Sequence, residues 1–237
     1  LAYAFDDAAV ATVATAVGAM EDAAMFRNRS RAAYKHLWDK KRMLLCPRKG
    51  VGANPELVCP LDPALPYPIE KKYTEGDALQ WLWFVPHDIE GLVDLFPTPA
   101  AFVSMLHQFF LDARTIKQGG KWAGGTWLAN AWYWAGNEPD ILAPFLFPLA
   151  GRAYHNYTSF WSRWLVDNDY GVKADGLPGN DDYGTLSSWL LWSVAGLYPL
   201  SGSEDFVLGA PRFEKMWIRR RHLDPAVADL CIVGHNV

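Results

Sequence analysis

The stretch Asp175-Gly-Leu-Pro-Gly-Asn-Asp-Asp-Tyr-Gly184 contains three glycines and a proline, so it predicts a loop rather than the interior of a helix or strand. It leads into residues 186–197, an apolar run of helical length. Asp181 and Asp182 therefore fall at or just before a helix N-terminus, where free N–H groups and the helix dipole stabilise negative charge. Carboxylates on such a turn suit a general base or a ligand of a hard cation, although a helix cap is the simpler explanation of either aspartate alone.

Two further segments repeat this design, in which an acid-bearing turn precedes an apolar segment. They are Tyr73-Thr-Glu-Gly76 and Gly136-Asn-Glu-Pro139. If the starts of the helices lie on one face of the fold, the three turns surround a single pocket. Two carboxyl groups across a pocket can cleave a glycosidic bond, since one protonates the leaving oxygen and the other activates water. Spare carboxylate oxygens can hold Ca²⁺.

Composition predicts a globular protein with a large core, because 51% of the 237 residues are apolar and only 20% are charged. The formal net charge is −4 and the basic runs are short, such as Arg219-Arg-Arg221, which argues against a nucleic-acid partner. No apolar run is long enough to span a bilayer. The chain has twelve Trp, twelve Phe and ten Tyr, which indicate either a large core or the recognition of sugar rings.

The three cysteines do not fit a disulfide-dense scaffold, and their spacing is not that of a zinc site. Cys46 and Cys59 bracket a proline-rich segment and can pair in an oxidising compartment. Two tripeptides, Asn28-Arg-Ser30 and Asn156-Tyr-Thr158, permit glycosylation in such a compartment. We therefore expect a secreted or secretory-pathway protein. The chain opens directly in helical sequence without an initiating Met, so we expect it to be a piece of a longer protein.

Apolar spacing predicts one helix after another, with no alternation of strands and helices and no phosphate-binding glycine pattern. Loops of alternately long and short length between the helices fit an α/α toroid, whose long loops gather on one face. We therefore predict an all-α fold, a partial (α/α)6 toroid, with a small β segment at the C-terminal end. The expected helices cover residues 2–18, 21–38, 74–85, 87–96, 98–113, 137–149, 152–166 and 183–197, with strand-like pieces after Pro199 and a loop carrying a short hairpin over 39–72.

Several of these motifs, in this order, resemble glycoside hydrolase family 92. They are Tyr73-Thr-Glu-Gly-Asp-Ala-Leu-Gln-Trp81, Trp83-Phe-Val-Pro-His-Asp88, Gly136-Asn-Glu-Pro139 and Asp175–Asp182 followed by Ser188-Trp189. Tyr3-Ala-Phe-Asp-Asp7 and Gly209-Ala-Pro-Arg-Phe213 extend the resemblance over roughly residues 1–218.

The resemblance implies a Ca²⁺-dependent exo-acting α-mannosidase that inverts anomeric configuration. The implied substrate is terminal α-linked mannose of an oligosaccharide or glycoprotein glycan, of N-glycan or mannan type. The resemblance also implies an N-terminal β-sandwich domain, absent from this chain, followed by an (α/α)6 barrel. Residues 1–200 are then an incomplete catalytic barrel, and residues 201–237 are the β segment and a tail that diverges from the family after Arg219.

Carried over by motif, Glu75 resembles the general acid, Asp182 the general base, and Asp181 its support. We expect Trp81, Trp83 and Phe84 to surround Glu75 and keep it protonated. The Ca²⁺ ligands are not assigned. Further substrate contacts are expected from four residues: Asn137, Glu138, Asn180 and Trp127.

One departure concerns the segment after Asn-Glu-Pro, where many relatives have a pair of histidines. This chain has Asp140-Ile-Leu-Ala-Pro144 instead, which leaves the preferred mannosidic linkage open. Two alternatives also stay open: a catalytically inactive carbohydrate-binding relative, and another α/α-toroid glycoside hydrolase. Whether this chain is active by itself stays open as well.

Overall fold

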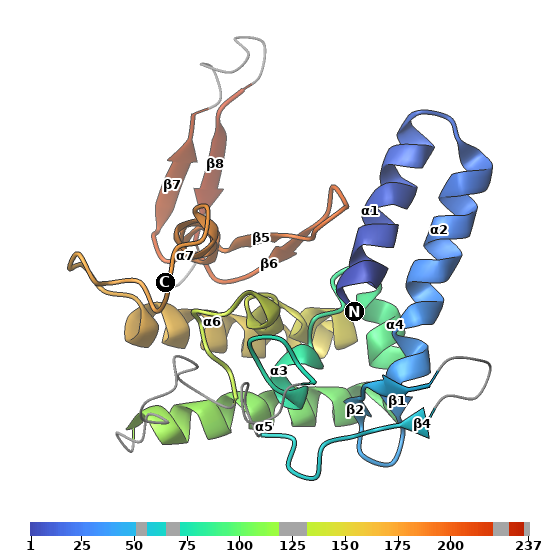
Figure 1. Cartoon of the computed structure of the whole chain (residues 1–237). Helices are drawn as coiled ribbons and strands as arrows, with labels where there is room; N and C mark the ends of the chain where they lie inside the picture. The colour runs from blue at the N-terminus through green and yellow to red at the C-terminus, as the bar shows by residue number, and fades with distance from the viewer. Residues whose placement is uncertain (51–55, 65–71, 119–131, 220–227, 235–237) are drawn as a thin grey trace.

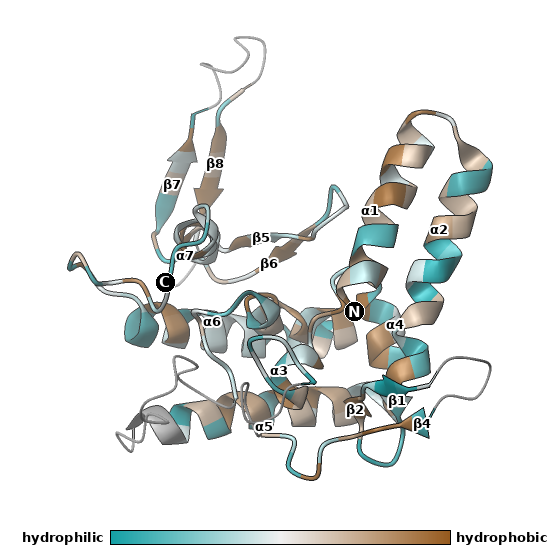
Figure 2. Cartoon of the chain, in the orientation of Figure 1, coloured by the Kyte–Doolittle hydropathy of each residue, from teal (hydrophilic) through white to brown (hydrophobic). Residues whose placement is uncertain are grey.

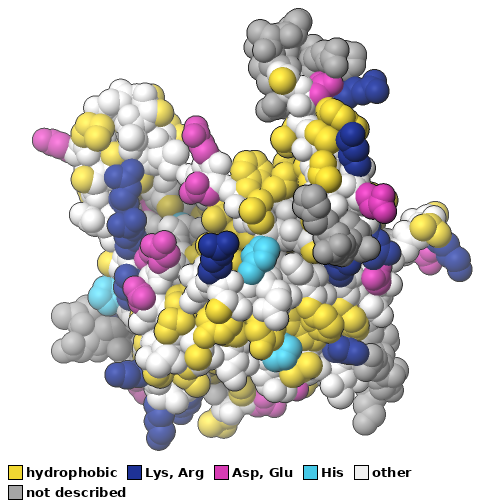
Figure 3. Space-filling view, turned by 180° about the vertical axis from the view of Figure 1, so that it is seen from behind, with side chains coloured by type: hydrophobic (Ala, Val, Ile, Leu, Met, Phe, Trp, Pro, Cys, Tyr) yellow, Lys and Arg dark blue, Asp and Glu magenta, His cyan; other side chains and the backbone are white. Residues whose placement is uncertain are grey.

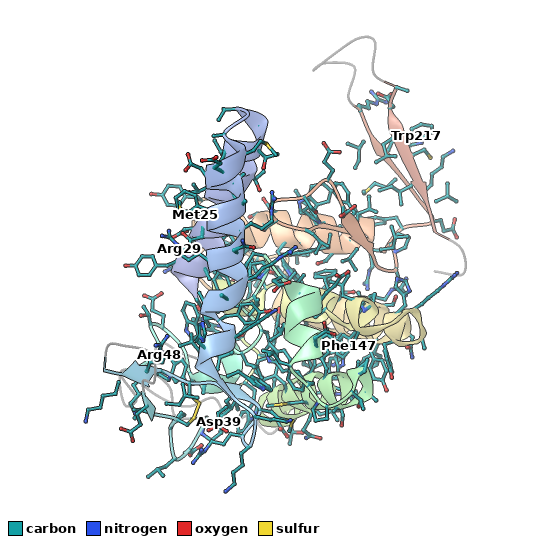
Figure 4. All side chains as sticks on the ribbon, turned by 90° about the vertical axis from the view of Figure 1, so that its right-hand side faces the viewer. Met25, Arg29, Asp39, Arg48, Phe147 and Trp217 are labelled. Carbon is teal, nitrogen blue, oxygen red and sulfur yellow. A yellow bond between two sulfur atoms is a disulfide. The ribbon has the colours of Figure 1, made fainter. Side chains whose placement is uncertain are left out.

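The computed structural model describes residues 1–50, 56–64, 72–118, 132–219 and 228–234. Two helices, α1 (Ala2–Ala16) and α2 (Met20–Ala33), form the predicted antiparallel hairpin at the N-terminus, which projects from the body of the molecule (Figure 1). Gly18 makes the turn with φ +80°, a conformation that favours glycine. Arg29 of α2, labelled in Figure 4, donates to Asp7 of α1 at 2.6 Å, and Ser30 donates to the Ala4 carbonyl at 2.6 Å.

The segment after this hairpin contains the predicted short β structure. Strand β1 (Trp38–Asp39) pairs with β2 (Leu44–Leu45), and β3 (Arg48–Lys49) pairs with β4 (Glu56–Leu57), each pair antiparallel. A disulfide joins Cys46 and Cys59 beside these strands, seen as a yellow bond near Asp39 in Figure 4. The predicted pairing of these cysteines is therefore confirmed.

The helix predicted over 74–85 is much shorter, because α3 covers only Ala78–Trp81. Asp77, not Thr74 or Tyr73, is its N-cap: the carboxylate accepts from the backbone N–H groups of Leu79 at 2.8 Å and Gln80 at 3.0 Å. Pro86 cannot continue the helix, and the chain has already left helical geometry before it. Two well-formed helices follow: α4 (Ile89–Asp94) and α5 (Pro99–Gln118).

The helix predicted over 137–149 is also wrong, since the chain there makes a series of 3₁₀ turns. Pro139, Pro144 and Pro148 each lack the N–H that an α-helix would use, and short 3₁₀ turns tolerate this loss. The turns are η2 (Glu138–Asp140), η3 (Ala143–Phe145), η4 (Phe147–Ala150) and η5 (Arg152–Tyr154).

The C-terminal part contains the two remaining predicted helices and the predicted β segment. Helix α6 (His155–Asp169) packs against α7 (Thr185–Ala195). Two antiparallel hairpins follow α7, of which the second projects from the body like the α1–α2 hairpin (Figure 1). The four strands are β5 (Leu197–Pro199), β6 (Phe206–Leu208), β7 (Lys215–Ile218) and β8 (Leu230–Val233). The described fold is thus mainly helical, while the partial toroid stays a prediction.

Aromatic side chains build the core that holds these elements together. Trp161 of α6 stacks on Phe110 of α5 with ring centroids 5.1 Å apart, and Phe145 stacks on Tyr198 at 3.9 Å. The largest fully buried side chains are mostly aromatic: Trp83, Trp161, Trp189, Tyr34, Phe102, Phe110, Phe145 and Phe147. Much of the high aromatic content therefore fills the core rather than a sugar site.

Hydrophobic residues recur along both helices of the projecting α1–α2 hairpin (Figure 2). Val13 on α1 is 63% exposed, Val17 directly after α1 is 74% exposed, and Met25 on α2 is 52% exposed. A cleft of about 1110 Å³ opens between this hairpin, α4, the turns at 148–155 and the β5–β6 hairpin. Figure 3 shows the hollow between the projecting hairpins from behind. Within the described residues, no helix is both long and apolar enough to cross a bilayer.

Candidate active site

Glu75 lies in the turn immediately before α3, and its side chain is exposed. Its backbone has φ +50°, a left-handed conformation that costs a non-glycine residue about 1–2 kcal/mol. Two hydrogen bonds to backbone carbonyls hold this turn in place. The side-chain amide of Asn137 donates to the Glu75 carbonyl at 2.7 Å, and the indole of Trp81 donates to the Thr74 carbonyl at 2.8 Å. The surrounding structure thus keeps Glu75 in a strained, accessible position.

Residues 134–140 form a tight turn that carries the second acidic motif. Asn137 is only 3% exposed, whereas Glu138 is half-buried. Asp140 is completely buried and accepts from the backbone N–H of Trp134 at 2.9 Å, which closes the turn. The indole of Trp134 donates to the Pro178 carbonyl at 3.2 Å. The second motif is therefore in direct contact with the loops that carry the first and the third.

The third motif separates its two aspartates into different environments. Asp181 accepts from the backbone N–H of Ser187 at 2.8 Å and from the Ser187 hydroxyl at 2.9 Å, so it caps the first turn of α7. Asp182 is exposed and has φ +39°, and Tyr183 and Gly184 continue in the left-handed region at +61° and +87°. The left-handed run thus leaves Asp182 exposed, while Asp181 holds the helix start.

The pKa of Glu138 depends on acidic side chains of the other two motifs. Its pKa is raised, first by burial, and then by a hydrogen bond to the Asp182 side chain and by the negative charges of Asp182 and Glu75. Burial and the neighbouring negative charges thus favour the protonated form of Glu138. Three carboxyl groups far apart in the sequence therefore occupy one electrostatic neighbourhood, as the repeated acid-bearing turns predicted.

Two buried acids beside this cluster were not identified from the sequence as site residues. Asp77 and Asp140 are both 0% exposed, and each stands two positions after a more exposed glutamate, Glu75 and Glu138. Burial raises the pKa of Asp77 to about 7, against the opposing effect of its two backbone hydrogen bonds, and burial also raises the pKa of Asp140. The repeated Glu-x-Asp spacing was the only sequence signal that pairs these positions.

The chain matches a known family of catalytic domains over nearly its whole length. The family model described as the glycosyl hydrolase family 92 catalytic domain matches residues 1–232. The chain belongs to glycoside hydrolase family 92.

This family 92 chain is similar to a fungal protein by sequence and to bacterial enzymes of known structure. A protein of Arthroderma benhamiae described as an uncharacterised secreted glycosidase is 31% identical over 137 residues, which are 58% of this chain and 15% of that protein. A family 92 α-mannosidase structure from Bacteroides thetaiotaomicron superposes with a TM-score of 0.74 at 29% identity, covering 92% of this chain and 26% of that one.

An inverting family 92 mannosidase from the same bacterium has a TM-score of 0.71 at 24% identity and covers 91% of this chain and 29% of that one. At this identity the likeness shows the fold. The chain spans about a quarter of the length of the solved relatives, and 15% of the curated one.

The family resemblance implies Ca²⁺, which would need a group of oxygen-bearing side chains to bind it. Across the described part of the chain, no three His, Cys, Asp or Glu side chains form a group arranged to hold a metal ion. Glu75, Glu138 and Asp182 share a neighbourhood without forming such a group. Among the described residues there is thus no Ca²⁺ site built from three acidic side chains, and we assign no ligand to the metal.

The sequence predicted that Trp81, Trp83 and Phe84 surround Glu75, and the structure of this family 92 chain corrects that prediction. Because α3 ends at Trp81, Trp83 turns into the core, where its ring packs on Phe102 with centroids 5.5 Å apart. Phe84 packs edge-on against Trp81 at 5.3 Å, but Glu75 itself stays exposed. Among the expected substrate contacts, Asn180 is exposed, Asn137 is buried, and Trp127 lies outside the described residues.

Proposed function

We propose that this chain carries the acid–base centre of a glycoside hydrolase that releases terminal α-linked mannose with inversion of configuration. The observation that carries the proposal is the meeting of Glu75, Glu138 and Asp182 from three separate loops. Membership of family 92 supports hydrolysis of a glycosidic bond. The described structural relatives, two mannosidases, support mannose as the sugar and, in one case, inversion as the outcome.

In this proposal Glu75 is the general acid and Asp182 is the general base. Glu75 donates a proton to the glycosidic oxygen as the bond from that oxygen to the anomeric carbon breaks. Asp182 removes a proton from a water molecule as the water oxygen bonds to the same carbon from the opposite face. Both carboxyl groups are exposed, so both are open to substrate. Inversion requires room for this water, which corresponds to about 6.5–9.5 Å between the carboxyl groups.

Glu138 and Asp181 support the base in different ways. Protonated Glu138 donates to Asp182 and keeps its carboxylate oriented. Asp181 caps α7 and fixes the left-handed run on which Asp182 stands. We also propose Asn180, Glu138 and Trp127 as substrate contacts, and Asn137 as a residue of the substrate-binding turn.

The natural substrate, compartment and metal follow from the same proposal. We propose a mannose-containing oligosaccharide or glycoprotein glycan as substrate, cleaved by a barrel of which residues 1–200 form part, with residues 201–237 as an appended β segment. Secretion is supported by the Cys46–Cys59 disulfide, by exposed Asn28 and Asn156 in the two tripeptides, and by the secreted relative. Calcium dependence rests on the family resemblance, and no step of the mechanism is assigned to the ion.

The test compares Glu75→Gln and Asp182→Asn on aryl α-mannosides with good and poor leaving groups. Loss of the acid should cost on the order of 10²–10⁴ in rate on the poor leaving group and much less on the activated one. Loss of the base should slow both substrates alike, because water must be activated whichever group leaves. Glu56→Gln and Asp22→Asn, at exposed positions on β4 and α2, are matched controls. Equal losses for Glu75→Gln on both substrates would remove it from the acid role, and a preference for aryl α-glucosides would replace mannose as the substrate.

A further inference from the structure

We propose that residues 134–140, here termed the bracket turn, hold two other loops at a fixed separation. These are the turn at residues 73–76, which carries Glu75, and the loop at residues 175–184, which carries Asp182. Asn137 and Gly136 are the positioning residues at its two contacts. This inference rests on the proposed function, because it takes Glu75 as the acid and Asp182 as the base.

The first contact of the bracket turn reaches the acid. Asn137 donates its side-chain amide to the Glu75 carbonyl at 2.7 Å across 62 positions of sequence. Glu75 is held at φ +50°, which a residue with a side chain adopts only when its surroundings enforce it. Without this bond, the Glu75 backbone can relax toward negative φ, and its carboxyl group would swing away from the site. Asn137 is 3% exposed, so solvent competes little for the bond.

The second contact reaches the loop that carries the base. Gly136 lies directly against this loop, and a Cβ built on it would stand 2.7 Å from the Pro178 carbonyl oxygen. The facing residue is also a glycine, since a Cβ on Gly179 would stand 3.0 Å from the Gly136 Cα. The Trp134 indole adds a hydrogen bond to the same Pro178 carbonyl at 3.2 Å. A side chain at position 136 would therefore push away the loop that leads to Asp182.

The bracket turn is stiff between these two contacts. Its backbone closes through bonds from Asn137 N–H to the Trp134 carbonyl at 3.0 Å and from Asp140 N–H to the Asn137 carbonyl at 3.0 Å. The buried Asp140 carboxylate adds a bond from the Trp134 N–H at 2.9 Å. Because neighbouring residues of one closed turn make both outward contacts, the turn determines the separation of acid and base.

Asn137→Ala and Gly136→Ala should therefore differ in how the rate loss depends on the leaving group. Asn137→Ala should resemble loss of the acid: a fall in kcat of about 10²-fold on an aryl α-mannoside with a poor leaving group, and a much smaller fall on an activated one. Asn137→Asp, which keeps the size but places an acceptor against the carbonyl when ionised, should behave similarly near neutral pH. Gly136→Ala should resemble loss of the base and slow both substrates by the same factor. KM should change little in each case.

Matched controls carry the same changes away from the bracket turn. Asn168→Ala removes another amide-to-carbonyl hydrogen bond, from Asn168 to Trp164 at 2.7 Å on α6. Gly209→Ala adds a methyl group where the nearest atom outside the adjacent residues is 3.7 Å away. Both controls should retain the leaving-group dependence of the parent chain. If Asn137→Ala instead slows both substrates by the same factor, and the rate losses of both variants simply follow a lower Tm, the turn is only structural and the proposal is overturned.

Crystal structures of the two variants separate this inference from the proposed function. If the parent chain hydrolyses no mannoside, the proposed function fails, yet the bracket can still be judged by its geometry. We expect the Glu75 carboxyl to move by on the order of 1 Å or more in Asn137→Ala, and the Asp182 loop to move in Gly136→Ala. Unchanged separation of the Glu75 and Asp182 carboxyl groups in both structures would overturn the inference.

Discussion

Replacing Asp77 by Asn tests the buried acid beneath the candidate site. Asp77 is 0% exposed, and one carboxyl oxygen caps α3 through the N–H groups of Leu79 and Gln80. Its other oxygen, Oδ2, is buried with no hydrogen-bond partner among the described residues. An unpartnered carboxylate oxygen strongly disfavours the ionised form. We therefore expect a proton on Oδ2 in the folded chain at mildly acidic pH. Asp77→Asn retains the capping oxygen and removes the titration.

The magnitude follows from the pKa of this group. Burial raises the pKa of Asp77 from 3.8 to about 7. Between these values the folded chain binds a proton that the unfolded chain has lost, so the free energy of unfolding falls by about 1.4 kcal/mol per pH unit. The stabilising contribution is fully present below about pH 4 and is lost as the pH rises to about 7. The total change is about 4 kcal/mol, and Asp77→Asn should lack it.

Urea unfolding of the parent chain and of Asp77→Asn at pH 4, 5.5, 7 and 8.5 measures this difference. The difference in unfolding free energy between the two should change by about 4 kcal/mol over the series, in favour of the variant at high pH. Asp22→Asn, at an exposed position of α2, is the control and should show no such trend. A difference between parent and Asp77→Asn that stays constant from pH 4 to pH 8.5 would refute the buried, protonated acid.

Three further predictions concern the site and its support. Glu138→Gln should keep a donor to Asp182 and retain substantial activity, whereas Glu138→Ala should disorient the base and slow substrates with good and poor leaving groups alike. Steady-state kinetics on aryl α-mannosides measure this difference. Equal activity of the two variants would contradict the role of Glu138. Exhaustive EDTA treatment should abolish mannosidase activity and added Ca²⁺ should restore it, while full activity after chelation would exclude a calcium requirement. Cys46→Ser with Cys59→Ser should lower the unfolding free energy by about 3 kcal/mol, since the disulfide closes a short loop, and a urea titration with no change in midpoint would show that this loop is held by other contacts.

The sequence predicted those parts of the fold that depend on long regular patterns. The α1–α2 hairpin, α5, α6, α7 and the late strands lie where apolar spacing placed them. It failed where local polar contacts or prolines compete with that spacing. The Asp77 cap delays α3, and three prolines divide the segment 139–148 into 3₁₀ turns. Apolar residues continue through both segments, so hydrophobic periodicity could not reveal either interruption.

The sequence also predicted that three acid-bearing turns would meet, because their shared design placed each before a new element. It could not predict how the side chains divide their tasks. Asn137 reads as an exposed polar residue of a loop, yet it is buried against the Glu75 carbonyl. Asp181 and Asp182 are adjacent and identical in type, and only the left-handed backbone at Asp182 separates the helix cap from the exposed acid. Such assignments depend on backbone conformation, which one sequence does not encode locally.

Proton NMR of the first product formed from an aryl α-mannoside tests the central claim most directly. With Glu75 as acid and Asp182 activating water on the opposite face, β-mannose should appear first and then mutarotate to the α anomer. The signal should be lost in Asp182→Asn and kept in the Asp22→Asn control. Appearance of α-mannose first would contradict the inverting acid–base pair on which the account depends.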